Sequence, residues 1–181
     1  MRERAAPVEA VIDALHAAKV EYVLIGGAAM MLHGAAYVTR DVDICYARSA
    51  SNVEALVAAL RPFEPRSRLD ERDSVPFLWE VRTILNGSNF TLRTSIGDVA
   101  ILGSVTGIGT YEEVRALAAR YAIGERQVTM LTVEGLIASK RASRFSISSR
   151  ASRSESTPTG VASSFGLRPI GTRPKTTYAR S

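Results

Sequence analysis

The chain has 181 residues, of which 46% are hydrophobic, and a formal net charge of +5. This length suits one domain with a proper hydrophobic core, and no apolar run approaches the 18 residues of a membrane-spanning helix. Charged residues recur between Arg2 and Lys19, which argues against a secretory signal. Cys45 is the only cysteine, so no intramolecular disulfide can form and we expect a cytoplasmic location.

The positive charge is distributed unevenly. Residues 143–181 hold seven arginines and lysines against Glu155 alone, a net charge of +6, so residues 1–142 carry a net charge of −1. The first 142 residues therefore do not indicate a general polyanion-binding surface. The last 39 residues contain 15 serines and threonines and no periodic apolar pattern. We predict a domain over residues 1–142 and a disordered tail over residues 143–181.

The N-terminal part predicts a helix, a strand, a glycine turn and a second helix. Residues 6–19 carry apolar side chains at helical spacing. Residues 22–25 form a short apolar run rich in β-formers, typical of a buried strand. Gly26 and Gly27 end this strand, and a glycine turn lets backbone amides come close to a bound group. A helix of about two turns is expected to follow, over residues 28–32.

A second strand, over residues 41–46, carries two aspartates. Apolar and polar side chains alternate along it, the pattern of a half-buried strand. Asp41 and Asp43 therefore leave the same face, about 6–7 Å apart along the backbone. Two carboxylates in this position repel each other unless a cation lies between them. Magnesium typically takes one or two carboxylates together with substrate phosphates, so this pair is a candidate metal site, the alternative being two surface aspartates.

A helix and a charged loop follow the second strand. Ser49 predicts the start of a helix whose apolar stripe ends before Pro62. Residues 61–76 predict a loop of mixed charge. Its arginines either contact a triphosphate or a nucleic acid or belong to a solvated, partly self-paired loop, and the second interpretation is favoured. These arginines are Arg61, Arg66, Arg68 and Arg72.

The remaining elements complete an α/β domain. Strands are predicted over residues 77–85, 90–94 and 99–102. A helix, a strand and a last helix are predicted over residues 111–121, 127–131 and 133–142. Thr132 is expected to cap the last helix, and Lys140 lies near its end.

Four short sequence motifs, in their order along the chain, resemble those of the nucleotidyltransferase superfamily with the DNA polymerase β fold. They are closest to its small bacterial branch of stand-alone and toxin-type proteins, and the resemblance covers roughly residues 6–142. The resemblance implies an α/β (α+β) fold, with a mixed sheet flanked by helices. The words are Gly-Gly-Ala-Ala-Met-Met-Leu-His-Gly (26–34), Thr-Arg-Asp-Val-Asp-Ile (39–44), Gly-Asp-Val-Ala-Ile-Leu-Gly (97–103) and Glu-Gly-Leu-Ile-Ala-Ser-Lys-Arg-Ala (134–142).

The resemblance also implies a reaction and a set of site residues. The superfamily transfers a nucleoside monophosphate from an NTP to a hydroxyl, with three carboxylates holding two Mg²⁺ ions. Asp41 and Asp43 match the first two carboxylates, and Gly26 and Gly27 match the turn beside the nucleotide phosphates. Lys140 matches a lysine of this branch, which either reaches the triphosphate or caps its helix. Acceptors in the superfamily include RNA ends, proteins and antibiotics, and the sequence does not select among them.

The third carboxylate of the superfamily is replaced here by Ala100. Three interpretations stay open. Asp98, two residues earlier and on the same strand face, substitutes for it. Alternatively, the protein binds nucleotide and one metal ion but transfers slowly. In the third interpretation it is a catalytically inactive nucleotide- or partner-binding module, for example one half of a toxin–antitoxin pair whose partner is a cognate antitoxin.

The superfamily pattern stops abruptly after Ala142. A Gly-Arg-x-Lys-Asp word and a closing helix normally follow the lysine-containing helix, and both are absent. We hypothesise that residues 143–181 are read from a shifted frame, which resequencing of the gene would test. RNA binding through this basic tail is a further functional hypothesis, and deletion of the tail should abolish it.

Overall fold

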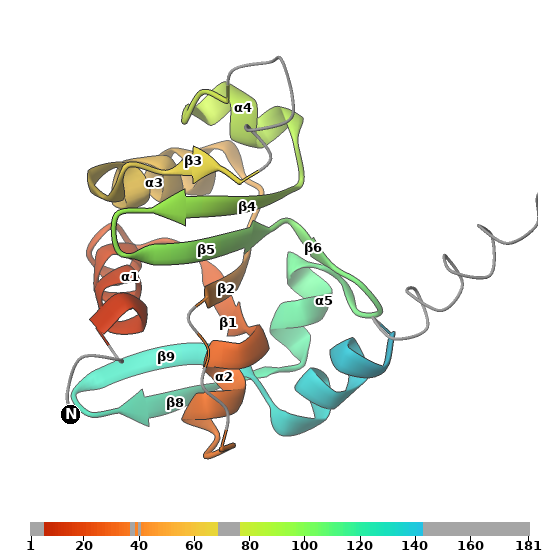
Figure 1. The fold of residues 1–181 in the computed structure, drawn as a ribbon. Coiled ribbons are helices and arrows are strands. Elements are labelled where there is room, and N and C mark those ends of the chain that lie inside the picture. The colour runs from red at the N-terminus through yellow and green to blue at the C-terminus, as the bar shows by residue number, and fades with distance from the viewer. Residues whose placement is uncertain (1–5, 37–38, 40, 69–76, 143–181) are drawn as a thin grey trace, which may run out of the picture.

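The computed structural model describes residues 6–36, 39, 41–68 and 77–142. Its central feature is a mixed sheet, whose strands are β1 (Tyr22–Ile25), β2 (Asp41–Tyr46), β3 (Arg66–Ser67), β4 (Asn89–Thr94), β5 (Gly97–Leu102), β8 (Ala118–Ile123) and β9 (Arg126–Leu131). The strands lie in the order β3-β4-β5-β2-β1-β9-β8 (Figure 1). A separate two-stranded ribbon contains β6 (Ser104–Val105) and β7 (Gly109–Thr110). The predicted mixed sheet is confirmed.

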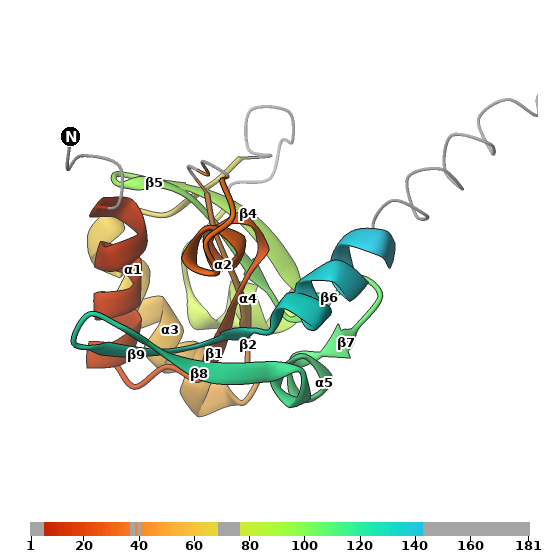
Figure 2. The same ribbon diagram turned by 90° about the horizontal axis from the view of Figure 1, so that it is seen from below.

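Helices cover the sheet. They are α1 (Ala6–Ala17), α2 (Gly26–Leu32), α3 (Ala50–Leu60), α4 (Val81–Asn86) and α5 (Tyr111–Ala116), with a 3₁₀ turn over Arg61–Phe63 and a final helix over residues 133–142. Figure 2 shows this final helix following the end of β9, and its last residue, Ala142, lies beside Gly107 in the loop between β6 and β7. Within the described ranges, no helix has both the length and the apolar character needed to cross a membrane.

The pleat of β2 separates the core from the candidate site. Val42 and Ile44 are buried on one face, whereas Asp41 and Asp43 are half-buried on the other. Towards the end of the strand Cys45 is buried on the aspartate face as well, because α2 and α5 pack against β1 and β2. The strand pairs antiparallel with β1 and parallel with β5. The aspartates therefore begin a strand that becomes fully buried further along.

The helix after β2 begins as predicted. The Ser49 side chain accepts a hydrogen bond from the Asn52 backbone N–H, which satisfies one free donor of the first turn of α3. Asn52 is itself buried, and its side chain bonds the backbone of Glu21 and the Ala47 carbonyl. A buried amide with all these partners fixes α3 to the start of β1 and the end of β2.

The predicted strand over residues 77–85 is wrong. The chain forms α4 there, starting at Val81. The Trp79 indole N–H donates to the Val57 carbonyl at 3.0 Å, and Ile84 is completely buried. These contacts hold the segment against α3, and tertiary packing has overridden its strand-like composition.

The predicted helix over residues 111–121 is correct only in its first half. It ends at Ala116, and β8 begins at Ala118 and pairs with β9. The predicted glycine turn at Gly26 and Gly27 is also wrong in detail, because these residues form the first turn of α2. The predicted tail over residues 143–181 and its frameshift hypothesis lie outside the described residues, as does Arg72.

Candidate functional site

The tightest contact of the candidate site joins the start of α2 to β2. Ile25 pairs with Asp43, so the chain enters α2 beside the Asp43 carboxylate. Gly26 has a φ of +64°, and a Cβ at this position would lie 2.0 Å from Asp43 Oδ2. The Gly27 backbone N–H donates a hydrogen bond to the same carboxylate. Glycine at position 26 is therefore required both by the backbone conformation and by the closeness of Asp43.

The Asp43 carboxyl holds its proton more tightly than an ordinary aspartate. Burial raises its pKa, the neighbouring Asp41 charge raises the pKa further, and the Gly27 hydrogen bond opposes both effects. A cation between the two carboxylates would remove the repulsion and replace lost solvation. The geometry and the electrostatics of the pair therefore fit a divalent metal with oxygen ligands.

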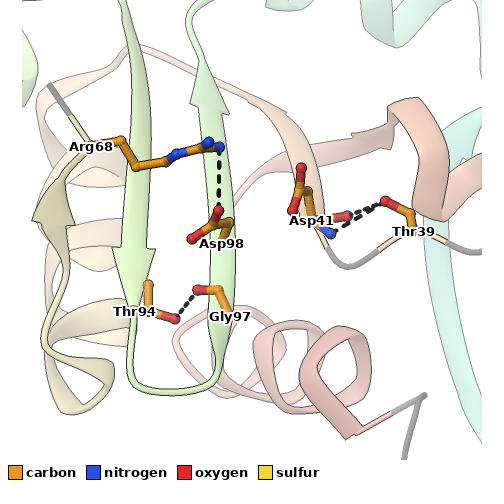
Figure 3. Close-up of polar contacts among 6 residues, drawn as sticks. All are labelled: Thr39, Asp41, Arg68, Thr94, Gly97 and Asp98. Carbon is orange, nitrogen blue, oxygen red and sulfur yellow. Dashed lines mark hydrogen bonds and ion pairs between the residues drawn. The ribbon is translucent and has the colours of Figure 1, made fainter.

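Asp41 is positioned by a short contact with Thr39. The Thr39 hydroxyl accepts a hydrogen bond from the Asp41 backbone N–H at 3.2 Å and lies 3.2 Å from the Asp41 carbonyl oxygen, to which it can donate (Figure 3). This contact fixes the backbone where β2 begins. Position 40, between the two residues, is outside the described ranges.

The register between β2 and β5 decides where the other expected carboxylates lie. Asp41 pairs with Asp98, and Asp43 pairs with Ala100. All four residues share one face of the sheet, because directly paired residues project to the same side. The position expected for the third carboxylate thus adjoins Asp43 and carries only a methyl group. Asp98 lies one row away, beside Asp41.

Asp98 has a cationic partner that the sequence did not reveal. The Arg68 guanidinium lies 3.2 Å from the Asp98 carboxylate, reaching it from the edge of the sheet (Figure 3). In the part of the chain that the structure describes, no three histidine, cysteine, aspartate or glutamate side chains converge as a ready-made metal cage. The structure brings together Gly26, Gly27, Asp41 and Asp43, and it places Asp98 beside them in an ion pair.

Lys140 contacts α2 further along the helix than the two glycines do. Its Nζ atom is 4.0 Å from the Met30 sulfur, one turn after the two glycines. The final helix and the second half of α2 line an open pocket of about 550 Å³, whose lining includes Met30, Leu136 and Ile137 together with Lys140. The role of Lys140 towards a triphosphate stays a prediction.

His33 has a structural place. Its Nε2 atom lies 2.8 Å from the Leu131 carbonyl oxygen, and its ring meets Tyr121 edge-on with centroids 4.8 Å apart. These contacts hold the end of α2 against β8 and β9.

Comparison with solved structures finds a protein of similar fold. The chain is similar to a Thermotoga maritima protein whose crystal structure is described as that of a "putative nucleotidyltransferase". The likeness covers 82% of this chain and 89% of that chain, with a TM-score of 0.59 and 13% sequence identity. The two proteins share a fold. No family model matches the sequence, and no curated protein sequence matches it significantly.

Proposed function

We propose that the protein transfers a nucleoside monophosphate from an NTP to a hydroxyl group, with Asp41 and Asp43 holding Mg²⁺. The observation that carries this proposal is the corner where Gly26 leaves room for the Asp43 carboxylate and Gly27 bonds it. A surface pair of aspartates needs no such fit. The fold shared with the Thermotoga maritima protein supports the same conclusion, and Lys140 is proposed to approach the triphosphate from the final helix.

The chain's own residues have defined tasks in this proposal. Gly27 orients the Asp43 carboxylate through its backbone N–H, and Thr39 fixes the backbone of Asp41. Burial on the sheet limits water around Asp43, which strengthens its interaction with any cation. Bound Mg²⁺ would neutralise the phosphate oxygens during transfer and stabilise the leaving pyrophosphate.

Ala100 sets the expected rate. A carboxylate beside Asp43 would help to hold metal and accept the proton of the attacking hydroxyl. Without one, general-base assistance, typically worth about 10²–10⁴-fold, is missing from this position. Asp98 is the remaining carboxylate on β5, but it adjoins Asp41 and is paired with Arg68. We therefore propose slow transfer by the natural sequence.

The alternative is a catalytically inactive module that binds a nucleotide or a partner, such as a cognate antitoxin. Two observations favour it together. Position 100, beside Asp43, carries only a methyl group, and the Asp98 carboxylate is held in an ion pair with Arg68. Toxin-type function belongs to this alternative and rests on the sequence resemblance alone. A small gene next to this one would support it.

Label transfer from α-³²P NTPs tests the proposal. The protein is incubated with Mg²⁺, cellular RNA and cellular protein, as wild type, Asp41→Ala and Ala100→Asp. We expect slow incorporation by wild type, none by Asp41→Ala, and incorporation faster by about 10²-fold or more in Ala100→Asp. Incorporation by Asp41→Ala at the wild-type rate would refute the assigned site. If none of the three proteins incorporates label although all are folded, the inactive module would be favoured.

A further inference from the structure

A second pocket lies at the opposite end of β1 from the candidate site. Its volume is about 230 Å³, and its lining comes from the end of α1, the start of β1, α5, β8 and β9. Tyr22, the first residue of β1, lines it and pairs with Tyr46, whereas Ile25, the last, pairs with Asp43. Three residue steps of about 3.3 Å each separate these two ends of the strand. The pocket is therefore distinct from the two aspartates.

Two arginines line this pocket from different elements. Arg115 lies on α5, one turn after Tyr111, so both side chains leave the same side of the helix. Arg120 lies on β8 and pairs with Thr129 of β9, which also lines the pocket. Among the described residues, neither arginine has a carboxylate within ion-pair distance. Guanidinium groups match oxyanions in geometry and charge, so this pair can hold one oxyanion between them.

The Tyr22 hydroxyl lacks a hydrogen-bond partner beside the same pocket. Tyr22 is only 6% exposed, and its hydroxyl is the one buried side-chain polar atom without a partner within the described ranges. Burial raises its pKa, and the Asp13 charge raises the pKa further, so the hydroxyl stays protonated and can donate. Asp13 itself is held by Arg126. Buried hydroxyls nearly always have a partner, and a bound oxyanion would supply the missing acceptor.

One acidic side chain narrows the class of ligand. Glu21 is exposed and is the one carboxylate among the described lining residues. Burial raises the pKa of the Tyr111 hydroxyl, the Glu21 charge raises it further, and the Arg115 charge opposes both effects. Glu21 and Arg115 therefore act on the same part of the pocket. A carboxylate repels a bare anion but accepts a hydrogen bond from a hydroxyl group, so the ligand should carry both kinds of group.

We propose that this pocket binds a small phosphate monoester whose carbon skeleton carries hydroxyl groups. Arg115 and Arg120 hold the phosphate, Tyr22 donates to one of its oxygens, and a ligand hydroxyl donates to Glu21. A phosphate monoester offers three free oxygens to these three donors, whereas a carboxylate offers two. The volume lies below the roughly 300–1,000 Å³ of pockets for drug-sized ligands, which limits the occupant to a small molecule. The inference does not depend on the proposed transfer reaction.

Calorimetric titration of the full chain tests the proposal. Ribose 5-phosphate, inorganic phosphate and ribose are titrated separately, at low salt and in EDTA. The pocket variants are Arg115→Gln/Arg120→Gln and Tyr22→Phe. The matched control is Arg61→Gln/Arg82→Gln, which removes two exposed arginines from the 3₁₀ turn and α4. A thermal melt of each protein checks folding.

We expect wild type to bind ribose 5-phosphate more tightly than inorganic phosphate, with no measurable binding of ribose. The affinity should fall by about 100-fold in Arg115→Gln/Arg120→Gln and by about tenfold in Tyr22→Phe, because each hydrogen bond to a charged group contributes about tenfold or more. The control should bind like wild type. An equal loss in the control, or no binding of ribose 5-phosphate by wild type, would overturn the proposal.

Two further results would also overturn it. If Tyr22→Phe binds ribose 5-phosphate like wild type and melts at a higher temperature, the hydroxyl is simply unsatisfied and faces no ligand. If glutamate binds more tightly than ribose 5-phosphate, and the double arginine variant loses that binding, the pocket recognises a carboxylate with an ammonium group instead of a phosphate.

Discussion

Two parts of the candidate site are built very differently. At the corner of α2 and β2, Gly26 lies so close to Asp43 that a side chain at position 26 would overlap the carboxylate, and the Gly27 backbone N–H donates to the same carboxylate. On β5, the residue beside Asp43 is Ala100, and Asp98 is neutralised by Arg68. The first part is a tightly fitted structure, and the second carries a methyl group where the sequence resemblance predicts a third carboxylate.

The two parts differ in whether a substitution affects the fold or only the reactivity of the site. The corner depends on backbone conformation and packing, so a substitution there disturbs the fold as well as the site. The β5 position depends on one side chain that contacts the solvent side of the sheet, so its replacement leaves the fold intact. If the proposed function is correct, we expect Ala100→Asp to raise the transfer rate without changing the shape of the site.

The largest effect should come from Gly26→Ala. The backbone at position 26 is left-handed, and Asp43 occupies the space of the new methyl group. We expect a loss of more than about 2 kcal/mol in the free energy of unfolding, because left-handed backbone alone costs an alanine about 1–2 kcal/mol. The rate of label transfer should also fall, because the new methyl group displaces the Asp43 carboxylate. Urea unfolding and transfer rates measure the two effects.

Gly124→Ala is the matched control. Gly124 has a φ of +61°, close to that of Gly26, but a Cβ there meets nothing within 4 Å. It should lose only the backbone contribution of about 1–2 kcal/mol and keep full transfer. Equal stability loss and equal activity in the two variants would show that the Asp43 contact has no consequence.

The next largest effect should be the dependence of the stability of Ala100→Asp on Mg²⁺. A third carboxylate beside Asp43 adds repulsion, so we expect the free energy of unfolding to fall by roughly 1–3 kcal/mol in EDTA. Mg²⁺ should recover this loss by binding the folded state, raising the Tm as its concentration increases. Ala100→Asn has a similar shape without the charge. If both variants respond equally to Mg²⁺ in a thermal melt, a carboxylate at position 100 takes no part in metal binding.

A smaller effect is the pH dependence of Asp43→Asn. The raised pKa of Asp43 means that the folded protein keeps a proton which the unfolded chain loses first. Its contribution to stability is thus present at low pH and decreases as pH rises from the ordinary aspartate value of about 3.9 through the raised value. Asp43→Asn should therefore have a higher Tm than wild type at pH 7, with the difference disappearing near pH 3. Glu54→Gln, on α3, controls for the loss of one carboxylate, and a difference independent of pH would contradict this account.

The smallest effect should come from Arg68→Gln. The side chains of Arg68 and Asp98 are 42% and 27% exposed, so their ion pair is well solvated. Exposed pairs contribute about 0–1 kcal/mol, and salt screens them. We expect urea unfolding to show a loss below about 1 kcal/mol that disappears in 1 M NaCl, with Arg120→Gln on β8 as the control. A larger, salt-independent loss would mean that Arg68 supports the sheet edge in another way.

The sequence predicted those features that depend on local pattern. The bounds of β1 and β2 follow from an apolar run and from strict alternation, and Asp41 and Asp43 were placed on one face for the same reason. The α4 segment was missed because its helical form depends on contacts of Trp79 and Ile84 with α3. The pairing of Arg68 with Asp98 was missed because it joins residues far apart in sequence that only strand register brings together.

The place of β2 in the sheet has a consequence for how the molecule opens. It is the middle strand, with β5, β4 and β3 on one side and β1, β9 and β8 on the other. Strands at the edges lose their hydrogen bonds in low-energy local openings, whereas a central strand exchanges its amides only when most of the sheet separates. We expect the amides of Val42 and Ile44 to be among the slowest to exchange with deuterium. The two aspartates are thus carried by the part of the chain that fluctuates least, and their spacing should persist even while the outer strands open and close.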